Sequence, residues 1–129
     1  MDNISNFLTI IRNGYNVKKK YIKVNYSNII LSIVKILYRN KYIKLYKIYN
    51  NKNKYKKIII SLKYINKLSV INKIIRISKP SNRKYLKYKN IKKVLNGYGI
   101  SIISTSFGLM TGYEAFSKKI GGEILCIIY

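Results

Sequence analysis

The sequence at residues 100–108 is ISIISTSFG, an apolar segment followed by three hydroxyl side chains and a glycine. The apolar half predicts a buried strand. Ser104, Thr105 and Ser106 carry hydroxyls that donate and accept hydrogen bonds, so they suit phosphate oxygens, ribose hydroxyls or base edges. Gly108 allows a close approach of backbone to a ligand. Taken alone, these residues fit a plain polar loop better than a binding loop.

The residues after this loop predict a short helix and a final strand. Thr111 and Glu114 have the spacing of a capping box, which predicts a helix to about Lys119 and gives Glu114 a structural role. Gly121-Gly122 then turns the chain into a strand over residues 123–129. Glu123, at its start, is open to two interpretations: an acceptor for base amino groups, or an edge-strand acid paired with a lysine.

Upstream of the loop, basic and aromatic residues alternate after a turn. Residues 70–77 predict a strand, and residues 78–82, with the chain's only proline, predict the turn that ends it. Arg83, Tyr85 and Lys87 follow; cations bind phosphate, and a tyrosine ring offers a face to a base or ribose. A tyrosine in a core is the competing interpretation, because Tyr is abundant in this chain.

The predicted fold class is α+β, in two small lobes. The N-terminal lobe, residues 1–65, has the order α-β-α-β-β; the C-terminal lobe, residues 66–129, is mostly antiparallel β with one or two short helices. The best candidate for a hinge is 63–68. The expected N-terminal elements are a helix capped by Asp2 or Asn3 and ended by Asn13-Gly14, a strand at 21–24, a helix at 28–39 capped by Ser27, and strands at 42–49 and 55–62 joined by a turn at 50–53.

The charge is extreme: 27 Lys and Arg stand against three acids, a net charge of +24. Codon bias toward A and T would enrich Lys, Asn, Ile and Tyr, yet it would not remove Glu. The near absence of acid therefore indicates a polyanionic partner. No histidine is present and Cys126 is the single cysteine, expected to be buried and inert. Ser-His catalysis and His- or Cys-cluster metal sites are excluded, and no cofactor is expected.

The polyanion is expected to be nucleic acid and not a membrane surface. Apolar runs fall far short of the ~20 residues of a spanning helix. The start of the chain shows no signal or transit pattern. We therefore expect neither a membrane nor a small-molecule substrate among the partners.

Several short motifs occur in order along nearly the whole chain: Arg12-Asn13-Gly14, Lys63-Tyr64, Arg76-Ile77-Ser78-Lys79-Pro80, Arg83 with Tyr85, Gly97-Tyr98-Gly99-Ile100, Ser104-Thr105-Ser106, Gly108, Met110-Thr111, Gly121-Gly122-Glu123 and Cys126. This ordered set resembles the family of the eighth protein of the bacterial-type small ribosomal subunit. Phe107 departs from it, because the family usually has a lysine or arginine there.

The resemblance implies a structural constituent of the ribosome that binds small-subunit ribosomal RNA directly. It implies binding to the central domain of that RNA, help in assembling the platform, and contacts with neighbouring small-subunit ribosomal proteins. By matching motif, the RNA-facing positions are Ser104, Thr105, Ser106, Gly122 and Glu123, with Tyr85 beside them; the expected RNA-binding set is completed by Gly108, Arg83, Lys87, Arg12 and Asn13.

Two other function classes compete. An enzyme lacks a credible acid–base pair, since acids are scarce and histidine is absent. A general architectural protein that coats nucleic acid lacks a recognisable groove-reading helix, and it is kept as the alternative. The A- and T-driven composition, with no presequence, favours a plastid-type organelle; a mitochondrion or a bacterium is the alternative.

Overall fold

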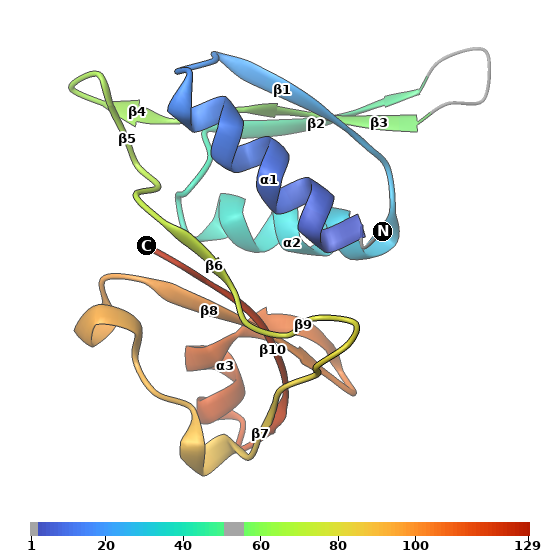
Figure 1. The fold of residues 1–129 in the computed structure, drawn as a ribbon, viewed down its shortest axis with the longest axis vertical. Coiled ribbons are helices and arrows are strands. Elements are labelled where there is room, and N and C mark those ends of the chain that lie inside the picture. The colour runs from blue at the N-terminus through green and yellow to red at the C-terminus, as the bar shows by residue number, and fades with distance from the viewer. Residues whose placement is uncertain (1–2, 51–55) are drawn as a thin grey trace. The chain divides into compact units, whose positions relative to one another are not determined.

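The computed structural model describes residues 3–50 and 56–129 (Figure 1). The chain divides into two compact units, Met1–Ile71 and Asn72–Tyr129, whereas the sequence placed the boundary after residue 65. Helices and antiparallel sheets are both present, so the expected α+β class is confirmed. The Asp2 cap and most of the expected turn at 50–53 lie outside the described residues.

The first unit has two helices on one face of a three-stranded antiparallel sheet of order β1-β3-β2 (Figure 1). The expected α-β-α-β-β order is confirmed, and a small hairpin that overlaps the expected hinge segment at 63–68 is added to it. The elements are α1 (Asn3–Asn16), β1 (Tyr21–Asn25), α2 (Asn28–Arg39), β2 (Leu45–Asn50), β3 (Lys56–Ser61), β4 (Tyr64–Ile65) and β5 (Leu68–Ser69).

The first helix does not end at Asn13-Gly14, as the sequence suggested. It continues to Asn16, and Gly14 is buried inside it. A Cβ on Gly14 would lie 2.8 Å from Cγ2 of Ile22 and 3.1 Å from Cδ1 of Leu62. The glycine is therefore needed for close packing of α1 on the sheet, and it does not terminate the helix.

The second helix and the hairpin follow the sequence more closely. Ser27 caps α2, because its Oγ accepts from the amide of Ile30 at 3.2 Å. The strands β2 and β3 pair in antiparallel fashion from Leu45 to Asn50. The first of them begins at Leu45 and not at Tyr42, because the amide of Tyr42 donates to the Leu37 carbonyl in the turn after α2.

The second unit is a five-stranded sheet with one short helix. Its path is β6-β10-β8-β9, and β7 also pairs with β10. The helix covers one face, over a core of Ile103, Met110 and Ala115. The elements are β6 (Ile74–Arg76), β7 (Tyr85–Leu86), the 3-10 turns η1 (Tyr88–Asn90) and η2 (Val94–Gly97), β8 (Ile100–Thr105), β9 (Gly108–Thr111), α3 (Gly112–Ser117) and β10 (Gly122–Ile128).

The Thr111 cap of the short helix is confirmed, while the strand expected at 70–77 is largely wrong. Thr111 Oγ1 accepts from the amide of Glu114 at 3.2 Å and donates to its carboxylate at 3.2 Å. Only Ile74–Arg76 form a strand, because the amides of Asn72 and Lys73 both donate to the Tyr129 carbonyl, at 2.7 and 2.8 Å.

Candidate nucleic-acid interface

The hydroxyl-rich segment is the tip of a hairpin and not a free loop. Ser104 and Thr105 are the last residues of β8, and the chain returns as β9 from Gly108. Thr105 Oγ1 accepts from the amide of Phe107 at 3.1 Å and donates to the carbonyl of Gly108 at 2.8 Å. The Thr105 hydroxyl thus belongs to the turn, and Ser106 and Phe107 are left exposed at the tip.

Gly108 has the backbone conformation that this hairpin requires. Its φ is +107°, in the left-handed region that favours glycine. A Cβ there would meet no atom within 4 Å, so the glycine is needed for the turn and leaves open space above it.

Cross-strand pairing brings distant residues of the expected site together. Tyr85 of β7 pairs with Glu123 of β10, Glu123 with Ser104 of β8, and Ser104 with Leu109 of β9. Directly paired residues present their side chains on the same face. We call Tyr85, Glu123 and Ser104 the polar row; Leu109 continues it as an apolar neighbour. The ring of Tyr85 is 70% exposed, and Ser106 lies at the adjoining tip.

The carboxylate of Glu123 is enclosed by partners of this chain. Its side chain is buried and accepts from the hydroxyl of Ser78. Arg83 Nη1 lies 3.1 and 3.3 Å from its two oxygens. Ser78 Oγ also accepts from the amide of Lys84 at 3.1 Å. These bonds fix the segment that carries Arg83 and Tyr85 against β10.

Two details of the sequence interpretation of Glu123 are therefore wrong. Its strand lies between β8 and other strands and not at an edge, and its cation is Arg83, not a lysine. Ser78 was expected only as part of a turn. Its role beside a rare acid could have been suspected from the scarcity of acids, but no local pattern indicated it.

Gly122 serves the sheet in a way that the sequence did not indicate. Its φ is outside the left-handed region. A Cβ on it would collide with the carbonyl oxygen of Ser104 and lie 3.0 Å from Cγ2 of Ile103. Gly122 therefore does not require a positive φ, and the close approach that it permits is between β10 and β8.

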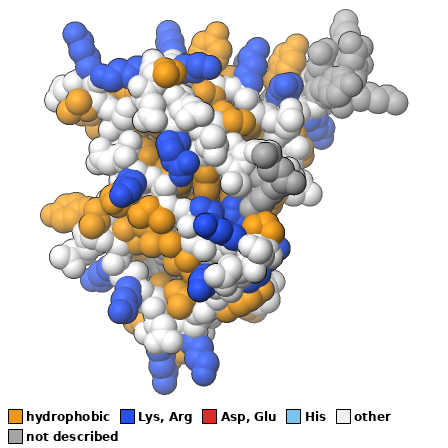
Figure 2. All heavy atoms as spheres, in the orientation of Figure 1, with side chains coloured by type: hydrophobic (Ala, Val, Ile, Leu, Met, Phe, Trp, Pro, Cys, Tyr) orange, Lys and Arg blue, Asp and Glu red, His pale blue; other side chains and the backbone are white. Residues whose placement is uncertain are grey.

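Basic residues occur in the segment that leads into and out of β7, which carries Tyr85 of the polar row. Arg83 keeps half of its side chain exposed despite its ion pair, and Lys79, Lys84 and Lys87 are exposed nearby in the sequence. The face drawn in Figure 2 shows Lys and Arg side chains and no acidic one. Such a surface attracts phosphate.

Arg12 and Asn13 are not members of the polar row. Both are exposed on α1, in the first unit, whereas the row is in the second. They remain candidates for a separate contact.

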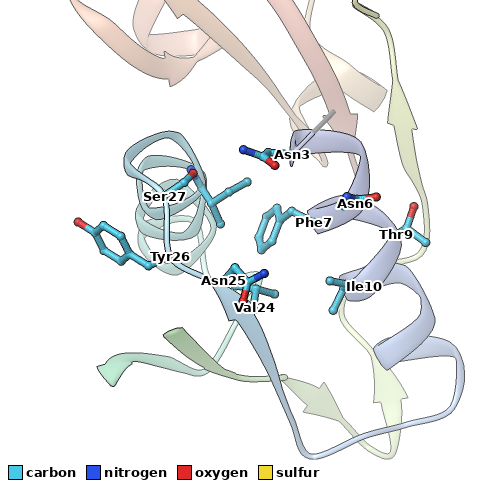
Figure 3. A pocket seen from close by; sticks show the side chains of 10 residues that line it. Asn3, Asn6, Phe7, Thr9, Ile10, Val24, Asn25, Tyr26 and Ser27 are labelled. Carbon is cyan, nitrogen blue, oxygen red and sulfur yellow. The ribbon is translucent and has the colours of Figure 1, made fainter. Parts of the chain in front are cut away.

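The first unit also holds a pocket of about 290 Å³ between α1 and the β1–α2 connection (Figure 3). Its lining combines amide and hydroxyl side chains with apolar ones, among them Phe7 and Ile10. None of the lining residues is charged, so the pocket offers no ion pair to a phosphate; they are Asn3, Asn6, Phe7, Thr9, Ile10, Val24, Asn25, Tyr26, Ser27 and Ile30.

The groups that could do chemistry are committed to structure. Burial raises the pKa of Cys126 to about 12, so the thiol stays protonated. Glu114 caps α3, and Glu123 is ion-paired. Within residues 3–50 and 56–129, no cluster of His, Cys, Asp and Glu could hold a metal, and no helix is long and apolar enough to cross a membrane. The fold and this row are those of a basic protein whose surface suits nucleic acid.

Comparison with known proteins gives the family. The family model of ribosomal protein S8 matches residues 2–129. The small ribosomal subunit protein uS8 of Phocaeicola vulgatus is 45% identical over 130 residues, covering 99% of this chain and 98% of that protein. The uS8 proteins of Azobacteroides pseudotrichonymphae and Amoebophilus asiaticus are 46% and 44% identical over the same shares. The chain therefore belongs to the ribosomal protein S8 family, whose members are structural, RNA-binding and non-enzymatic.

Proposed function

We propose that this chain binds the central domain of small-subunit ribosomal RNA through its second unit and helps to assemble the platform beside neighbouring small-subunit ribosomal proteins. The single observation that carries this proposal is the polar row next to an exposed hairpin tip. The row offers an aromatic face at Tyr85 and hydroxyls at Ser104 and Ser106, inside a strongly basic chain.

The chemistry of this row suits irregular RNA. Duplex RNA is bound mainly through 2′-hydroxyl and phosphate contacts in its shallow groove, and irregular positions expose bases for stacking and hydrogen bonding. The serine side chains are short, so their hydroxyls can contact such groups without ordering a long flexible side chain. Arg83 and Lys87 supply the attraction to phosphate, while Glu123 positions Arg83 and the strand that carries Tyr85.

The remaining members of the expected set have narrower roles in the proposal. Thr105 and Gly108 shape the tip, and Gly122 allows β10 to pass close to β8. Arg12 and Asn13 would contact RNA from the first unit.

The compartment proposed is that of a bacterial ribosome. The relatives named above are bacterial uS8 proteins, which supports the bacterial alternative over the plastid-type organelle favoured by composition.

The test is binding of a central-domain RNA fragment and of random RNA of equal length. Ser106→Ala should weaken the cognate complex by about 1–3 kcal/mol, because a buried RNA group loses its partner. Random RNA should be little affected. Ser5→Ala, at an exposed hydroxyl on α1, is the matched control. Equal losses on both RNAs would contradict a specificity role for the tip.

A salt titration of the parent chain tests the electrostatic part. If roughly 6–10 phosphates are contacted, affinity should fall about 10³- to 10⁵-fold between 50 and 200 mM salt. An affinity that hardly depends on salt would mean that the basic surface is not the binding surface.

A further inference from the structure

The sheet of the first unit has a face that its helices do not cover. The helices pack on the face that carries Ile22, Ile58 and Ile60, all buried (Figure 1). Side chains along a strand alternate between faces, so the residues between them point the other way. We call that side the open face; it presents Tyr21, Lys23, Leu45, Lys47, Tyr49 and Lys57.

Three lysines lie on the open face, two of them in its middle row and one in the row of Tyr49. Lys23 of β1 and Lys47 of β2 pair with Ile59 of β3 from its two sides. Their backbones are therefore two strand spacings apart, about 10 Å. Lys57 lies two residues along the central strand. The sequence has no acid between Asp2 and Glu114, so the described part of this unit offers these lysines no carboxylate.

Large apolar and aromatic side chains frame the lysines. In the full chain, the exposed fractions are 55% for Tyr21, 54% for Leu45 and 51% for Tyr49. Tyr21 lies in the row on one side of the central lysines and Tyr49 in the row on the other. When one face of a sheet packs on the core and the other only meets solvent, the solvent face carries polar side chains. Rings beside cations on a sheet face are instead an arrangement that binds unpaired nucleic acid, by stacking and by attraction to phosphate.

We propose that the open face is a second RNA-binding surface, and that its ligand is an unpaired RNA segment. Stacking on Tyr21 and Tyr49 requires bases whose faces are free, which a duplex does not offer. The lysine cluster without acids favours a polyanion over a protein surface of mixed charge. The proposal adds a sheet surface to the contacts expected from Arg12 and Asn13 on α1, and it does not depend on which RNA helix the second unit binds.

The first experiment uses the full chain and a fluorescent 12-nucleotide oligouridine. The double variant Lys23→Gln/Lys47→Gln should bind it more weakly, and its slope of log affinity against log salt should be shallower by about 1.4, because each single-strand phosphate contact contributes about 0.7. The matched control is Lys35→Gln/Arg39→Gln, which removes the same charge from α2, on the covered side of the sheet. An equal loss of slope in the control would overturn the proposal.

The second experiment tests stacking. Tyr49→Ala should lower oligouridine affinity at least about fivefold, the lower end of what one stacked base contributes. Tyr49→Phe keeps the ring and should restore binding. Far-ultraviolet circular dichroism checks that each variant is folded. Binding by Tyr49→Ala equal to that of the parent would contradict a stacking platform.

Two further measurements distinguish this proposal from the proposed function of the second unit and from binding of an acidic protein segment. The Lys23→Gln/Lys47→Gln variant should discriminate the central-domain fragment from random RNA as well as the parent does, whereas Ser106→Ala should discriminate less. Failure of the parent to discriminate at all would overturn the proposed function but not the proposal for the open face.

Oligoglutamate of equal charge is the last probe. If it binds the open face as tightly as oligouridine, the surface fits an acidic protein segment and the RNA proposal is wrong.

Discussion

At the scale of single residues, the Ser78–Glu123–Arg83 cluster is the feature that positions the site. The carboxylate is buried, and its bonds come from a turn residue and from a half-exposed guanidinium. Sequence reasoning selected Glu123 and Arg83 separately, from motif and from base–aromatic alternation. It could not predict that they meet, because the contact joins residues 40 positions apart.

Ser78→Ala should destabilise the second unit. The substitution removes a donor to Glu123 and an acceptor for the Lys84 amide, and each buried group left without a partner costs about 1–3 kcal/mol. Urea denaturation measures the loss. Ser81→Ala, an exposed serine of the same turn, should change stability by less than about 0.5 kcal/mol. Equal stabilities of the two variants would show that the cluster does not support the fold.

At the scale of elements, patterns confined to neighbouring residues were predictable and long-range ones were not. The helix from Ser27 and the strand from Ile100 to Thr105 follow from capping and apolar content. The return strand β9 was missed, because four residues after a tight turn carry no periodic signal. Asn13-Gly14 resembled a helix end because a local pattern does not include the packing of Gly14 on Ile22 of the next strand.

Gly122 gives a prediction at the level of the sheet. Gly122→Ala should destabilise the second unit by about 1–3 kcal/mol, because the added methyl collides with the Ser104 carbonyl of the adjacent strand. Gly122→Val should cost more. RNA binding should be lost in parallel with the folded fraction, measured by circular dichroism at the same temperature. A variant that is as stable as the parent but fails to bind RNA would instead place Gly122 at the RNA surface.

At the scale of the whole molecule, composition predicted the partner class but not its placement. The acids in the described residues, Glu114 and Glu123, are used for a helix cap and an ion pair. Most lysines therefore have no carboxylate partner in the chain, whose net charge is +24. The open face and the polar row depend on strand register, which composition cannot specify.

Buried ionisable groups predict a loss of stability in alkali. The Tyr15 hydroxyl donates to the Tyr42 carbonyl at 2.6 Å and accepts from the Lys63 amide at 3.1 Å. Burial raises its pKa from 10.0 to about 12, and burial raises the pKa of Cys126 from 9.0 to about 12. Both groups hold their protons more tightly in the folded chain. Their contribution is complete below pH 9 and is lost as the pH rises toward 12.

The free energy of unfolding, measured in urea, should therefore fall between pH 9 and 11. Tyr15→Phe should be less stable than the parent at pH 7 by about 1–3 kcal/mol, since a buried carbonyl and amide lose their partner. Its stability should nevertheless fall less steeply with pH, because one of the titrating groups is gone. Tyr113→Phe, at an exposed ring, should keep the parent's slope. A parent whose stability rises from pH 9 to 11, or a Tyr15→Phe variant with an unchanged slope, would show that Tyr15 does not link folding to pH.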